Sequence, residues 1–126
     1  MKIREAIEYA DKLAHNSYPR ETKIAWLSQL DGHVHREIIL THRGVDPGTE
    51  DFVGYTAETP QDTVLLVPFP YDEMYRFYLE MKIDEANRES AHYNISALKF
   101  NTAYQTYMDR SNRTHVPIGT ANGFYF

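Results

Sequence analysis

The sequence predicts an all-α protein: a small four-helix bundle with a long loop or short β-ribbon between helices 2 and 3, and an extended C-terminal tail. Apolar residues recur at intervals of three and four over four separate stretches, which is the spacing of one helix face. The stretches 43–63 and 112–126 lack this period and carry Gly and Pro residues typical of turns. A chain of 126 residues has the size of one domain, so we assign 1–111 to a helical body with an inserted loop at 43–63, and 112–126 to a tail.

The first two helices are predicted at residues 3–15 and 20–41. Apolar stripes define both: Ile3, Ala6, Ile7, Ala10, Leu13 and Ala14 in the first, and Ile24, Leu27, Leu30, Val34 and Ile38 in the second. Gly32 weakens the middle of the second helix, which we expect to bend or end there. Trp26 lies roughly 100° around the helix from that stripe. It is either a second core contact or an exposed anchor for a partner.

The third helix is predicted at 71–91, opened by Pro70, and carries two adjacent apolar faces. These faces comprise Met74, Phe77, Tyr78 and Met81, and Tyr75, Leu79, Ile83 and Ala86. Such a wide arc means that the helix is central to its own domain or also touches another chain. If it touches another chain, Tyr71 and Tyr75 are the candidate contacts.

The fourth helix is predicted at 95–111, with Asn94 as its N-cap. Its apolar stripe consists of Ala97, Phe100, Tyr104, Tyr107, Met108 and Ser111. The short break before it predicts an antiparallel pair with the third helix.

Two stretches without helical period complete the chain. Within 43–63, Asp46-Pro47-Gly48 is a turn signal, and the segments 52–55 and 63–67 are candidates to pair as a short β-ribbon. A connection this long in a compact domain is usually functional or mobile. The tail ends in Phe124, Tyr125 and Phe126, an aromatic peptide suited to a partner's groove or sheet edge.

Composition excludes several classes of protein. The absence of cysteine excludes disulfides and thiolate metal sites. A net charge of −5 argues against a nonspecific grip on nucleic-acid phosphates. No apolar run approaches the roughly 18 residues of a membrane span, and the first residues lack a signal-peptide core. Ten tyrosines indicate either an interface or a small core filled with amphipathic rings.

The histidines show no spacing that would place two of them on one metal ion. His33 and His35 point apart on a helix, and His42 lies two turns from His35. His92 has no second histidine at helical spacing. We therefore expect no catalytic metal and no cofactor.

Charged residues of the third predicted helix are spaced for ion pairs. Glu80 and Asp84 alternate with Arg76 and Arg88 at four-residue steps, which favours a solvated ladder of ion pairs over a catalytic acid pair. The sequence also lacks a phosphate-binding loop, a nucleophile elbow and a His-Glu-x-x-His motif. The chain is therefore not expected to be an enzyme.

The stretch 60–115 resembles the head–tail connector (adaptor, or head-completion) proteins of tailed phages and prophages. The resemblance rests on Leu65-Leu66-Val67-Pro68-Phe69-Pro70-Tyr71-Asp72-Glu73-Met74-Tyr75, Ile83-Asp84-Glu85-Ala86-Asn87, Tyr93-Asn94-Ile95-Ser96, Phe100-Asn101 and Asn112-Arg113-Thr114-His115. It is weaker over the first 42 residues and absent over 43–59 and the tail.

The resemblance implies a structural virion protein without enzymatic activity or cofactor. Copies would form a dodecamer-like homo-oligomeric ring below the portal protein, bind a tail or stopper protein, and pass genomic DNA without sequence-specific contacts. The location would be the virion neck, after assembly in the bacterial host cytoplasm, with no membrane association. Candidate contact residues are Trp26, Tyr71, Tyr75, Phe124, Tyr125 and Phe126. The alternatives are another small component of the phage neck or tail, or a nonviral helical adaptor.

Overall fold

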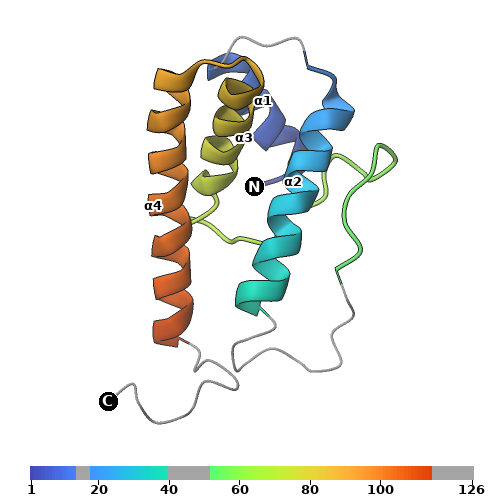
Figure 1. Ribbon diagram of the computed structural model, residues 1–126. Helices are drawn as coiled ribbons and strands as arrows, with labels where there is room; N and C mark the ends of the chain where they lie inside the picture. Colours follow the sequence, from blue (N-terminus) through green and yellow to red (C-terminus); the bar gives the residue numbers. More distant parts are fainter. Residues whose placement is uncertain (14–17, 40–51, 115–126) are drawn as a thin grey trace.

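The computed structural model describes residues 1–13, 18–39 and 52–114 (Figure 1). All regular structure in these residues is helical, which confirms the all-α class for them. The elements are α1 (Ile3–Leu13), α2 (Arg20–Val34), the π-helical turn η1 (His35–Ile39), α3 (Glu73–Ala86) and α4 (Ser90–Thr114). None of the described helices is both long enough and apolar enough to cross a membrane.

Helix α3 is the centre of the core. It packs against α1, α2 and α4, most extensively against α4. Met74, Tyr75, Leu79 and Ile83 are each 0% exposed, so both predicted apolar faces of this helix are used within the chain. The wide apolar arc is thereby explained by burial in the helix's own domain.

Helices α3 and α4 form the predicted antiparallel pair, joined by residues 87–89 (Figure 1). Arg88 in this turn has a positive φ of 59°. Aromatic rings line the interface. Ring centroids lie 5.0 Å apart for Tyr78 and Phe100, and 5.8 Å apart for Tyr71 and Tyr107. Such pairs add to the stability gained from burying their surface.

The boundaries of this pair differ from the prediction. Helix α3 begins at Glu73, because Pro70 lies in a preceding turn in which the Tyr71 amide donates to the Pro68 carbonyl (2.9 Å). Helix α4 begins at Ser90, so Asn94 is inside the helix and is not its N-cap. Most residues of its first turns are exposed and carry no apolar stripe, which is why periodicity placed the start too late.

The predicted stripes of α1 and α2 face the core. Ile3, Ala6, Ile7 and Ala10 are buried in α1, and Ile24, Leu27, Leu30 and Val34 in α2. The α-helical part of α2 ends two residues after Gly32 and continues as η1, which buries Ile38. Residues 14–15 and 40–41 of the predicted helices lie outside the described residues.

The connection before α3 does not form the expected ribbon in the part that the structure describes, residues 52–72. Val64 instead forms an isolated antiparallel bridge with Lys2. The Ile3 amide donates to the Thr63 carbonyl (3.0 Å), and the Leu65 amide donates to the Met1 carbonyl (2.9 Å). The start of the chain therefore takes the place that a second strand of the ribbon would occupy. Residues 43–51 and 115–126 lie outside the described residues, whereas residues 112–114 of the predicted tail belong to α4, which ends at Thr114.

Candidate functional site

The most heavily bonded polar group in the described core is the carboxylate of Asp31 on α2, which is 0% exposed. It accepts hydrogen bonds from the hydroxyls of Tyr55 and Tyr75, each at 2.5 Å, and from the Leu66 amide at 3.1 Å. Tyr75 belongs to α3, whereas Tyr55 and Leu66 belong to segment 52–72. One carboxylate thus joins three parts of the fold that are far apart in the sequence.

Further bonds fix segment 52–67 to the helices. The Tyr55 amide donates to Ser28 Oγ (3.0 Å), and the Val67 amide donates to the Tyr75 hydroxyl (2.7 Å). Gly54 has a φ of +90°, and a Cβ built there would lie 2.7 Å from Ser28 Oγ. Only glycine adopts this backbone at so close an approach without strain. The segment is therefore bound to α2 near its first residues and to α3 at its last residue.

The electrostatics of this cluster indicate a structural role. Burial raises the pKa of the Asp31 carboxyl, although the hydrogen bonds from Tyr55 and Tyr75 oppose the shift. Burial and the nearby Asp31 charge raise the pKa of both tyrosines, so their hydroxyls remain donors. Asp31 and Tyr75 are closed to solvent, so neither can meet a substrate in this conformation.

Tyr75, a candidate partner contact, is 0% exposed and donates its hydroxyl to Asp31, so it offers no surface to a partner in this conformation. Trp26 and Tyr71 are half-buried. Trp26 packs edge-to-face with Tyr18 at 6.1 Å between ring centroids, and Tyr71 packs against Tyr107. Both retain some exposed surface and stay candidates. Phe124, Tyr125 and Phe126 lie outside the described residues.

Four exposed aliphatic side chains lie on α4 and on segment 52–64. The outer α4 face carries Ile95 (56% exposed) and Leu98 (68%). The loop edge, defined as Val53 (95%) and Val64 (63%), lies on segment 52–64. Figure 1 shows α4 on one side of the fold and the green first part of this segment on the other, with α2 between them, whereas Val64 pairs with Lys2 next to the start of α1. Sequence periodicity did not single out any of these four residues.

A third exposed region surrounds Arg76 on α3. Its guanidinium lies over the Tyr9 ring at 5.4 Å and over the Phe77 ring at 5.0 Å. Phe69, which precedes a cis peptide bond to Pro70, is 85% exposed and lines the same hollow as Tyr9 and Arg76. Arg76 Nε is buried without a hydrogen-bond partner and lies 4.0 Å from Glu80 Oε1.

The predicted ladder of ion pairs on α3 forms only in part. Arg76 and Glu80 approach each other, but Asp84 is buried and accepts a hydrogen bond from Ser96 Oγ on α4 at 2.6 Å. Asp84 turns inward because the α3–α4 turn brings Ser96 over the end of α3. Desolvation raises the pKa of Glu80, although the nearby charges of Lys99 and Arg76 oppose the shift.

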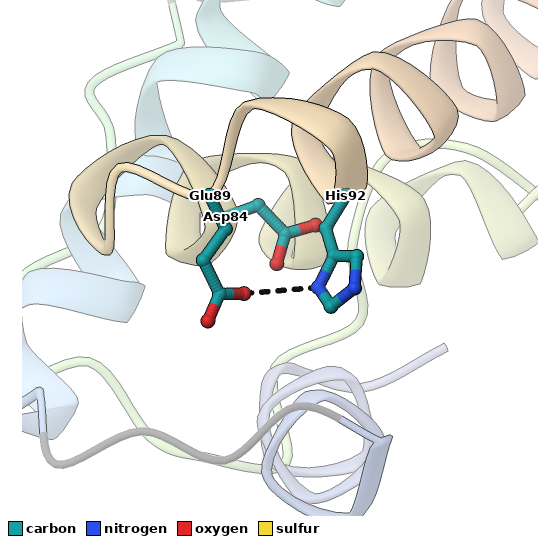
Figure 2. A group of neighbouring side chains, drawn as sticks. All are labelled: Asp84, Glu89 and His92. Atoms are coloured by element: carbon teal, nitrogen blue, oxygen red, sulfur yellow. Dashed lines mark hydrogen bonds and ion pairs between the residues drawn. The ribbon is translucent and has the colours of Figure 1, made fainter.

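The same turn gathers three potential metal ligands, shown in Figure 2. Asp84 comes from α3, Glu89 from the turn and His92 from the first turn of α4. One oxygen or nitrogen atom of each lies within 4.8 Å of the others, and Glu89 Oε2 is 3.0 Å from His92 Nδ1. His92 has no second histidine at helical spacing, so the sequence did not indicate it as a metal ligand. The Glu-x-x-His spacing of Glu89 and His92 is present in the sequence, but only the fold of the α3–α4 turn places Asp84 beside them.

No family model matches the chain, and no curated protein or solved structure matches it either.

Proposed function

We propose that the chain is a structural subunit of a tailed-phage virion, a head–tail connector that assembles as a homo-oligomeric ring below the portal protein. The resemblance of residues 60–115 supports this role. Assembly would take place in the host cytoplasm, and the ring would bind the portal on one side and a tail or stopper protein on the other.

The observation that carries the proposal is the presence of exposed apolar groups on two different parts of the fold, α4 and segment 52–64. A rotational ring is built from heterologous contacts, in which one face of a subunit meets a different face of the next. The outer α4 face and the loop edge are two such faces, and both expose branched aliphatic side chains. Burial of these side chains in a ring would stabilise it by roughly 25 cal/mol per Å² of apolar surface removed from water.

The charge of the chain suits a conduit for DNA. A net charge of −5 does not favour binding to phosphates, so a duplex can slide past the subunits without being held. Trp26 and Tyr71 supply further half-buried aromatic surface for contacts with neighbours or with the portal. We assign the tail, with Phe124, Tyr125 and Phe126, to the same assembly contacts.

The first test images the purified chain by negative-stain electron microscopy, alone and with portal-containing heads. Rings on the portal are expected. Attachment only to tail parts would favour another virion component, and the absence of binding to any virion part would overturn the proposal.

A pair of charge variants tests the ring contact itself. Leu98→Glu disrupts the outer α4 face and Val53→Glu disrupts the loop edge, so each alone should fail to form rings. A mixture of the two should give dimers, because the intact loop edge of one variant meets the intact α4 face of the other. Lys12→Glu, an exposed change on α1, should leave rings intact. Rings formed by both Leu98→Glu and Val53→Glu would overturn this assignment of faces.

A further inference from the structure

We propose that Asp84, Glu89 and His92 form a binding site for a divalent transition-metal ion of the zinc class, at the turn between α3 and α4. The ion would be structural and would join the end of α3 to the start of α4. This inference does not depend on the proposed virion function.

The first support is the combination of ligands. One imidazole and two carboxylates come from three consecutive parts of the chain, and their candidate ligand atoms lie within 4.8 Å of one another (Figure 2). Zinc–ligand bonds of about 2.0–2.2 Å bring the ligand atoms of a tetrahedral site to roughly 3.4 Å from one another. The side chains of Glu89 and His92 are 49% and 69% exposed, so both can rotate to close that difference.

The second support is the state of Asp84, which is 7% exposed. Its side-chain carboxylate accepts a hydrogen bond from a neutral hydroxyl, Ser96 Oγ at 2.6 Å. Among residues 1–13, 18–39 and 52–114, Asp84 forms no ion pair with lysine or arginine. Buried charges in proteins are normally paired with an opposite charge or bound to a metal. A bound cation would supply the charge that this carboxylate lacks.

The third support is access from solvent. Asp84 and Glu89 line a surface hollow together with Ser90, Tyr93 and Asn94, whereas His92 lies outside its lining. The hollow gives an ion a path to the buried carboxylate. Arg88 lines the same hollow and opposes a cation by its charge, but it is exposed and can turn away.

The ligand set favours zinc over the common hard cations. Imidazole suits zinc and its first-row neighbours, and zinc also accepts carboxylate oxygen. Calcium and magnesium prefer sites made of oxygen ligands and bind imidazole poorly. We therefore expect Zn²⁺ and Co²⁺ to bind, and Mg²⁺ and Ca²⁺ to bind much more weakly.

The test is calorimetric titration of the dialysed full chain with Zn²⁺, with the Co²⁺ absorption spectrum as a second readout. The wild type should bind Zn²⁺, and the affinity should fall more than about tenfold in His92→Ala and in Glu89→Gln. Even the loss of an outer-shell partner lowers the affinity of metal sites by about 10–100-fold. Zn²⁺ should raise the thermal midpoint of the wild type but not that of His92→Ala. Both substitutions change exposed side chains, so loss of folding does not confuse the result.

His33→Ala is the matched control. His33 Nδ1 lies 3.4 Å from Glu37 Oε1, and its side chain is 66% exposed, so this pair resembles Glu89–His92 without the buried carboxylate. His33→Ala should retain full affinity, whereas Asp84→Asn should lose it while circular dichroism stays unchanged. Unchanged zinc affinity in His92→Ala, or equal loss in His33→Ala, would overturn the proposal. So would the absence of zinc binding by the wild type.

Discussion

Asp31 and Asp84 are both buried carboxylates, but their surroundings differ. Asp31 lies between α2, α3 and segment 52–72 and accepts three hydrogen bonds. Asp84 lies at the α3–α4 turn and accepts one, from Ser96. The difference separates two uses of a buried charge. A carboxylate with many donors serves the fold, whereas one with few keeps the capacity to bind something else.

The largest effect in this comparison is expected for Asp31→Ala. The substitution leaves two tyrosine hydroxyls and one amide without their acceptor, which should lower the free energy of unfolding by about 3–5 kcal/mol. Denaturant titration measures the change. Asp62→Ala is the control, because its side chain is 66% exposed and pairs only at the surface with Lys2 and Arg4. A loss for Asp31→Ala no larger than for Asp62→Ala would refute the central role of Asp31.

The next largest effect on stability is expected at Gly54, in the segment that is hydrogen-bonded to Asp31. Gly54→Ala places a Cβ 2.7 Å from Ser28 Oγ at a φ of +90° and should cost about 1–2 kcal/mol. Gly32→Ala inside α2 meets nothing within 4 Å and should stabilise the chain by about 0.5–1 kcal/mol. Opposite signs in thermal unfolding are expected for the two variants, and equal signs would contradict the described path of this segment.

Asp84→Ala should cost less, about 1 kcal/mol, because only the Ser96 hydroxyl loses its acceptor. The lost charge also lies toward the C-terminal end of α3, where a negative charge is unfavourable with the helix dipole. The comparison is made in metal-free buffer by the same denaturant titration. A loss as large as that of Asp31→Ala would erase the distinction between the two carboxylates.

The pH dependence of stability sharpens the comparison further. Burial raises the pKa of Asp31 above its ordinary value of 3.8, so folding favours the protonated form. The resulting contribution to stability is complete below pH 3.8 and is lost as the pH rises through the raised pKa. The stability of the wild type relative to Asp31→Asn should therefore fall over that acidic window. A difference that is flat with pH would show that the donors cancel the effect of burial.

The helices could be predicted from the sequence because apolar periodicity reports the buried face directly. The start of α4 could not, since residues 90–94 carry no apolar stripe. The wide apolar arc makes Tyr75 a candidate for either role, core residue or partner contact, because helical spacing does not reveal that a carboxylate on α2 meets its hydroxyl. The ligand group at the α3–α4 turn depends on a chain reversal through Arg88 at positive φ, which no helical spacing encodes.

The central position of α3 has a consequence for synthesis on the ribosome. Helices α1 and α2 emerge first, but much of the surface that covers their apolar faces belongs to α3 and to residues 63–67. Because domains fold as units, the first two helices cannot reach their final packing until α3 has emerged. Stalled nascent chains that end before residue 73 should therefore be cut readily by protease, whereas chains released after α4 should resist. If the shorter chains resist protease, α1 and α2 fold without α3.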